Sequence, residues 1–137
     1  MLIDSNILVY SINIASPKNK DAQNFLQKNI GKLDVAHQNI FETLRILTHS
    51  KFSNPMEINA AREAIEKILE ACDIITPDYK THRIALELII KHNIVSNQIF
   101  DAYLAATAIS NGIDTLATDN IKDLQRFSEL TIINPFV

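Results

Sequence analysis

Short apolar runs alternate with longer amphipathic segments along the whole chain, and this order constrains the fold more than any other feature. Five runs have the length and composition of strands: 1–3, 33–36, 74–75, 115–117 and 131–133. The segments between them place apolar residues at helical spacing. The expected helices cover 18–29, 39–51, 57–71, 79–92 (or 81–92), 100–110 and 122–127. Such alternation predicts a parallel α/β sheet with helices on both faces, in one domain covering residues 1–137.

The composition fits a globular protein of the cytoplasm. Hydrophobic residues make up 47% of the chain and charged residues 21%, which argues against disorder. The single cysteine, Cys72, cannot form an internal disulfide, and it continues an apolar helical stripe, so we expect a buried structural thiol in a reducing compartment. No apolar stretch is long enough for a membrane span or a signal peptide. A net charge of −3 gives no overall basic field for nucleic acid.

Four acidic residues occupy positions where an unpaired charge is unexpected. Asp4 follows the first strand, Asp119 follows the strand 115–117, Asp101 opens an almost wholly apolar helix, and Glu42 lies within an amphipathic helix. Parallel sheets bind ligands beyond the carboxyl ends of their strands, so these side chains are expected to converge. Clustered carboxylates repel one another unless a cation lies between them. The pattern therefore indicates a site for a hard divalent metal, Mg²⁺ or Mn²⁺.

Each of these acids also has an alternative role that requires no site. Asp4 could begin a turn through its side chain, and Asp119 could cap the helix that follows it. Glu42 could lie on a solvated helix face together with Arg45, three residues further on. Asp101 could simply interact with the dipole of its helix. The joint occurrence of all four at one expected sheet edge favours a site.

Several motifs, taken together and in this order, resemble the PIN-domain nucleases, and within them the toxins of the VapC and FitB type. These motifs are Asp4-Ser5-Asn6, Glu42 with Leu44-Arg45, Asp101-Ala102 leading Ala105-Ala106-Thr107-Ala108, Leu116-Ala117-Thr118-Asp119-Asn120 with Asp123, and the closing Asn134-Pro135-Phe136. The resemblance implies a three-layer α/β/α fold with a central five-stranded parallel sheet. It also implies a Mg²⁺ or Mn²⁺ site, endoribonuclease activity on RNA, a homodimer and a cognate antitoxin protein.

The resemblance also implies roles for individual residues. Asp4, Glu42 and Asp101 match the acidic triad that binds metal and carries catalysis, and Asn6 and Thr118 match its polar supports. The fourth position is open among Asp119, Asn120 and Asp123, with Asp119 the preferred choice. Arg45 is the strongest candidate for contact with an RNA phosphate or an antitoxin carboxylate.

Other functions remain as alternatives. A phosphatase with an aspartyl nucleophile would need an acid two residues after Asp4, where Asn6 cannot transfer a proton. With only Gly31 and Gly112 in the chain, no glycine-rich phosphate loop exists. An RNA-maturation nuclease without an antitoxin is compatible with the same motifs. A catalytically inactive PIN-like module that binds RNA or protein is disfavoured, because it has no use for clustered carboxylates.

Overall fold

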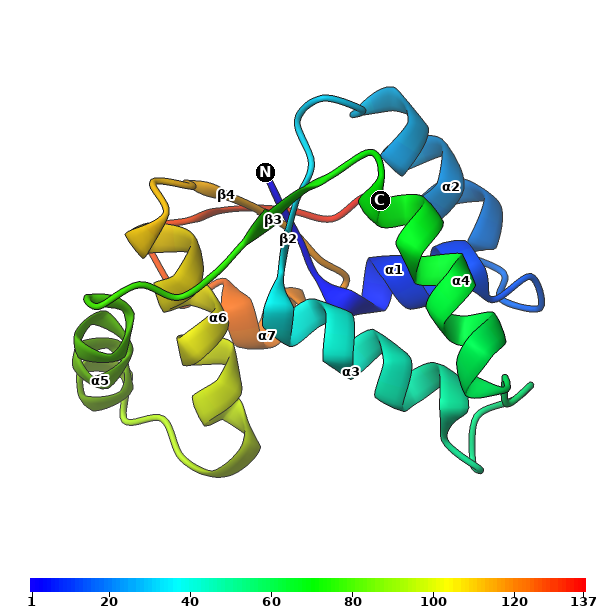
Figure 1. Cartoon of the computed structure of the whole chain (residues 1–137). Coiled ribbons are helices and arrows are strands. Elements are labelled where there is room, and N and C mark those ends of the chain that lie inside the picture. Colours follow the sequence, from blue (N-terminus) through cyan, green and yellow to red (C-terminus); the bar gives the residue numbers. More distant parts are fainter.

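The computed structural model describes the whole chain, residues 1–137, and shows one parallel sheet enclosed by helices (Figure 1). The strands are β1 (Leu2–Ile3), β2 (Asp34–Ala36), β3 (Asp73–Ile75), β4 (Thr115–Ala117) and β5 (Thr131–Ile133). The helices are α1 (Ser5–Ile12), α2 (Asn19–Lys28), α3 (His37–Thr48), α4 (Ile58–Leu69), α5 (Thr81–His92), α6 (Ile99–Ser110) and α7 (Ile121–Leu124), with a 3-10 turn, η1, at Ser96–Gln98.

The strand order places the first strand at the centre of the sheet. The order is β3-β2-β1-β4-β5, and every neighbouring pair is parallel. The chain moves outward from β1 to β3 and then crosses back to β4 on the other side of β1. In the register, Ile3 lies beside Ala117, and the Asp4 amide donates to the Ala117 carbonyl at 3.0 Å. Asp4 and Thr118 therefore emerge side by side where the strand order reverses, which is where open α/β sheets bind ligands.

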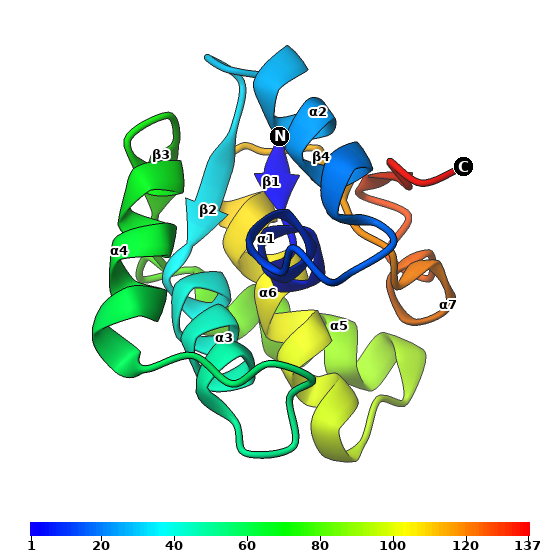
Figure 2. The ribbon, with the colours of Figure 1, turned by 90° about the vertical axis from the view of Figure 1, so that its right-hand side faces the viewer.

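Successive side chains of each short strand point to opposite faces of the sheet, so the core is divided into two layers. Leu2 and Leu116 are buried on the face covered by α5 and α6, in a cluster that also holds Leu124 and Phe127. Ile3 and Ala117, one residue further along, are buried on the opposite face against α1 and α2. Figure 1 shows these helices on opposite sides of the sheet, and in Figure 2 α1 lies in front of it and α6 behind. This arrangement confirms the expected three-layer α/β/α fold with five parallel strands.

Helix α1 has no counterpart among the elements expected from the sequence. Its side chains at Ser5, Ile7, Leu8, Val9 and Ser11 are all buried, because the helix lies between the sheet and the outer helices. A helix buried nearly all round has no polar face, so it shows no helical periodicity. The other expected elements are present with ends shifted by a few residues at most.

Gly112 has a φ of +73°, so a left-handed residue follows the end of α6. Two smaller expectations can be compared with the structure directly. Cys72 packs half-buried beside Ile68 and Leu69, and burial raises the pKa of its thiol to about 11, as befits a structural thiol rather than a nucleophile. No helix of the protein is both long and apolar enough to cross a bilayer.

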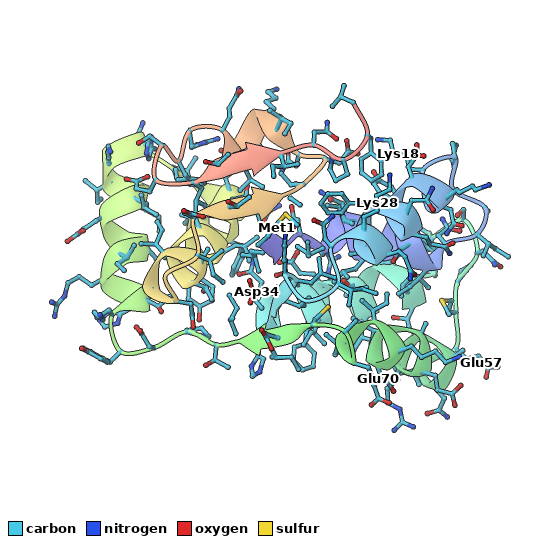
Figure 3. All side chains as sticks on the ribbon, turned by 90° about the horizontal axis from the view of Figure 1, so that it is seen from above. Met1, Lys18, Lys28, Asp34, Glu57 and Glu70 are labelled. Atoms are coloured by element: carbon cyan, nitrogen blue, oxygen red, sulfur yellow. The ribbon has the colours of Figure 1, made fainter.

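The N-terminal ends of the strands carry an ion pair that fixes the start of the chain. Figure 3 shows Met1 and Asp34 close together at the middle of the molecule. The terminal ammonium group of Met1 lies 2.7 Å from the Asp34 carboxylate and also donates to the Lys32 carbonyl. These contacts hold β1 beside β2, and they lie at the opposite end of β1 from Asp4.

Candidate active site

Asp4 is buried and surrounded by hydrogen-bond donors. It is the N-cap of α1, and its Oδ1 accepts from the Ser5 amide at 2.8 Å and more weakly from Asn39 Nδ2 at 3.5 Å. Its Oδ2 accepts from Thr118 Oγ1 at 2.7 Å and from Asn6 Nδ2 at 3.3 Å. The sequence allowed a turn through the Asp4 side chain, and in the structure that side chain instead caps a helix. A cap needs only one of these bonds, and the others hold the carboxylate in a fixed orientation.

Burial dominates the electrostatics of Asp4. It raises the pKa of the carboxyl group above its ordinary value, the hydrogen bonds from Thr118 and Ser5 oppose this, and the negative charge of Glu42 adds to it. A carboxylate that is both desolvated and close to another acid is stabilised by a nearby cation.

Replacing Thr118 with valine is expected to lower the free energy of unfolding by about 1–3 kcal/mol. The buried hydroxyl donates to Asp4 and accepts from Asn6 Nδ2 at 3.1 Å and from the Asn120 amide at 2.9 Å. Valine has nearly the same shape but leaves all three groups without this partner. Urea denaturation measures the effect.

The matched control is Thr43→Val, at a second buried threonine, whose hydroxyl bonds only the Asn39 carbonyl in its own helix. We expect a smaller loss there. Equal losses at Thr118 and Thr43 would show that the Thr118 network adds nothing beyond ordinary burial.

Glu42 extends from α3 toward Asp4 and is held at both oxygens. Its Oε2 accepts from Ser5 Oγ at 3.0 Å, and its Oε1 accepts from Gln38 Nε2 at 2.7 Å. Gln38 also donates to the Phe100 carbonyl at 3.0 Å. The bond to Glu42 lies within α3, and the bond to Phe100 ties α3 to the first turn of α6.

Asp101, in that first turn, completes a cluster of interacting acids. Its pKa is raised to about 6, first by burial and then by the negative charges of Asp4, Asp123 and Glu42, while Arg126 opposes the rise. Three of the four acids expected from the sequence, Asp4, Glu42 and Asp101, therefore lie close enough for their charges to interact, and Asp123 joins them.

Asp119, the preferred fourth acid from the sequence, has other partners. Its Oδ2 accepts from Lys18 Nζ at 2.6 Å and from the Tyr10 hydroxyl at 2.8 Å. The bond from Lys18 is the main reason that the pKa of Asp119 is lowered. Lys18 also lies over the rings of Tyr10 and Phe136, each at 5.1 Å. The charge of Asp119 is thus already balanced.

Asp123, in α7, is the acid after β4 whose charge raises the pKa of Asp101. Its Oδ2 accepts from Asn120 Nδ2 at 3.2 Å, as expected for a side chain reaching back to the start of α7, and Asn120 is the N-cap of that helix. Arg126 lies 3.9 Å from the other oxygen. Among the three positions left open by the sequence, the electrostatics favour Asp123 over Asp119.

A cavity of about 650 Å³ opens beside Glu42 and Asp101. Its remaining walls come from α3, η1 and α6, and they are Gln38, Phe41, Arg45, Asn97 and Phe100. Arg45 is exposed, so its guanidinium group can reach a ligand in the cavity. The structure therefore brings Arg45 to the same opening as two of the acids.

The donor chemistry of this cluster suits a hydrated hard cation. The acids offer only oxygen ligands, and burial together with neighbouring negative charge raises the pKa of Asp4 and Asp101, an effect that a bound cation would relieve. No group of three or more Asp, Glu, His or Cys side chains is already arranged to hold a metal ion. Mg²⁺ needs no such closed cage, because one or two carboxylates commonly hold it while it keeps several waters.

Three residues of the site were not identified from the sequence. Asn39 is fully buried and contacts Asp4, and its position one helical turn before Glu42 is a signal that could have found it. Gln38 orients Glu42, and Tyr10 binds Asp119. Gln38 is four residues before Glu42, a spacing that is common for a polar pair on any exposed helix. Tyr10 binds a residue 109 positions away, so no local pattern indicates its role.

Comparisons with known proteins place this geometry in context. A family model described as "PIN domain" matches residues 1–130. The curated protein "Ribonuclease VapC24" of Mycobacterium tuberculosis is 28% identical over 144 residues, covering 97% of this chain and 94% of that protein. The crystal structure of VapBC2 from Rickettsia felis bound to a promoter DNA fragment has a TM-score of 0.74 at 22% identity, covering 97% of this chain and 96% of that one. A toxin-antitoxin complex from Klebsiella pneumoniae has a TM-score of 0.71 at 17% identity, covering 98% and 97%.

Proposed function

Because the chain belongs to the PIN-domain family, we propose that it is a metal-dependent endoribonuclease and the toxin of a toxin–antitoxin pair. The observation that carries the proposal is that Asp4 is buried where the strand order reverses and is linked through Ser5 to Glu42, with Asp101 close enough for both charges to raise its pKa. The names of the relatives, a ribonuclease and a toxin-antitoxin complex, support the substrate and the partner. A homodimer is the assembly we propose with them.

The proposed metal site uses Asp4, Glu42 and Asp101, with Asp123 in the fourth position in place of Asp119. Mg²⁺ or Mn²⁺ at this site would stabilise charge on the phosphoryl oxygens and lower the pKa of a water molecule that attacks phosphorus. No side-chain nucleophile is then required. The carboxylates are suited to this role because their burial and mutual repulsion are relieved by a cation.

The other residues orient these acids and the substrate. Thr118, Asn6 and the Ser5 amide hold Asp4 from three directions, so its orientation does not depend on a ligand. Gln38 and Ser5 fix the two oxygens of Glu42. Arg45 at the cavity is free to bind a phosphate of RNA or, in the inhibited state, a carboxylate of the antitoxin.

We expect the purified, partner-free protein to cut cellular RNA into discrete fragments with Mg²⁺ or Mn²⁺ and to leave it intact with EDTA. Gel analysis of total RNA measures this directly. The matched control is the Asp4→Asn protein, which keeps the size of the side chain but loses its charge. Intact RNA from folded protein with either metal would contradict the proposal, and cleavage that persists in the Asp4→Asn protein would reveal a contaminating nuclease.

A further inference from the structure

Two exposed phenylalanine rings border the acidic cavity. Phe41 on α3 is 66% exposed and Phe100 on α6 is 59% exposed, although both belong to helices with well-buried faces. Both rings line the cavity of about 650 Å³ that contains Glu42 and Asp101. They also line a second cavity of about 350 Å³, whose walls include His37, Pro77 and Tyr103.

The two cavities adjoin each other, because Gln38, Phe41 and Phe100 line both of them. We call the two cavities together the aromatic groove. One end carries the carboxylates of Glu42 and Asp101 with Arg45, and the other end is aromatic. The charged end suits a phosphodiester, through the metal site and the guanidinium group. The aromatic end suits a nucleobase, which can stack on the ring faces.

Gln38 links the acidic end of the groove to its aromatic end. Its Nε2 donates to Glu42 Oε1 at 2.7 Å and to the Phe100 carbonyl at 3.0 Å. Glu42 is therefore held beside the turn that carries Phe100, so a base stacked on the Phe100 ring would lie next to a phosphate at the acidic end.

We infer that the aromatic groove binds an unpaired nucleobase of the substrate, stacked on Phe41 and Phe100, next to the phosphate that lies at the acidic end. The inference rests on the proposed ribonuclease function. In duplex RNA the base faces are covered by neighbouring bases and cannot lie on a protein ring, whereas a base in a loop or single strand can. Phe41 and Phe100 are therefore substrate-binding residues that favour RNA cut at unpaired positions.

The test separates stacking from cleavage by measuring binding in EDTA. The probe is a single-stranded oligoribonucleotide that contains 2-aminopurine, compared with the same strand annealed to its complement. Wild-type protein is expected to quench the single-stranded probe and to bind the duplex more weakly. Phe41→Leu and Phe100→Leu remove the ring but keep an apolar side chain, and each is expected to weaken single-strand binding about tenfold and to reduce the quenching.

The matched control is Tyr79→Leu, because Tyr79 is an aromatic residue, 82% exposed, that lines neither cavity of the groove. Its binding should equal that of wild type, and circular dichroism should show that all variants are folded. Unchanged binding in both phenylalanine variants would overturn the inference and leave the groove to a protein partner, even if RNA is cleaved. If quenching depends on both rings but the protein cleaves no RNA with metal, the base-binding role of the groove is supported and the proposed ribonuclease function is refuted.

Discussion

Replacing Asp101 with asparagine should reduce RNA cleavage by about a thousandfold or more, while the same change stabilises the protein in the absence of metal. The carboxylate is placed in the first turn of α6 and is affected by the charges of Asp4, Glu42 and Asp123. Asparagine keeps the shape of the side chain. It is neutral, so it does not balance the charge of a metal ion, and its amide oxygen binds the ion more weakly than a carboxylate does. Single-turnover cleavage of a labelled RNA measures the loss.

The gain in stability follows from the raised pKa of Asp101. The folded value is about 6 and the ordinary value is 3.8, so folding disfavours the charged form. The unfavourable contribution is fully present above about pH 6 and disappears as the pH falls to 3.8. At pH 7.5 in EDTA we expect Asp101→Asn to raise the free energy of unfolding by about 1–2 kcal/mol, a value reduced for the partial exposure of the group. Near pH 4 the difference should be small.

Urea denaturation at the two pH values measures this difference. The matched control is Asp114→Asn, because Asp114 is exposed and precedes β4, at the opposite end of the strand from Thr118. It should change neither cleavage nor its pH dependence. A loss of stability in the Asp101→Asn protein at pH 7.5 would contradict the assignment of Asp101 to a strained acidic cluster. Added Mg²⁺ should stabilise wild type more than Asp101→Asn.

The sequence predicted the architecture well because the pattern of the fold is local. Each strand except the first is followed or preceded by a helix with an apolar stripe, and the turn at Gly112 carries its own signal. Helix α1 was missed for a physical reason. Its residues are buried on nearly every side, so nothing in the order of polar and apolar residues distinguishes it from a strand.

The positions of the acids could also be inferred, but their partners could not. Asp4 and Asp101 stand out because a charge is unexpected beside apolar runs. The pairing of Lys18 with Asp119 joins residues that are 101 positions apart, and Asn39 reaches Asp4 across 35 positions. Such contacts depend on how α1, α3 and the loop after β4 pack together, and no local sequence pattern predicts this packing. The partners on which the proposed choice between Asp119 and Asp123 rests could therefore not be predicted.

Replacing Asp123 with asparagine is expected to slow RNA cleavage about ten- to a hundredfold, the effect typical of removing a group that supports a metal site. Asp119→Asn, in the loop between β4 and α7, is the matched comparison, and it should leave the cleavage rate almost unchanged. The reason is that Asp123 contributes to the raised pKa of Asp101, whereas the charge of Asp119 is balanced by Lys18 at 2.6 Å. Cleavage of labelled RNA at several Mn²⁺ concentrations measures both variants.

The metal dependence of these two variants distinguishes the roles of the acids. If Asp123 supports the metal, the Asp123→Asn protein should recover part of its activity as the Mn²⁺ concentration rises. The Asp119→Asn protein should instead lose up to about 1 kcal/mol of stability, because an ion pair between partly exposed groups has been removed. The opposite result, a large loss of cleavage in Asp119→Asn and none in Asp123→Asn, would return the fourth position to Asp119. The metal would then bind Asp119 through Oδ1, because Lys18 and the Tyr10 hydroxyl both contact Oδ2.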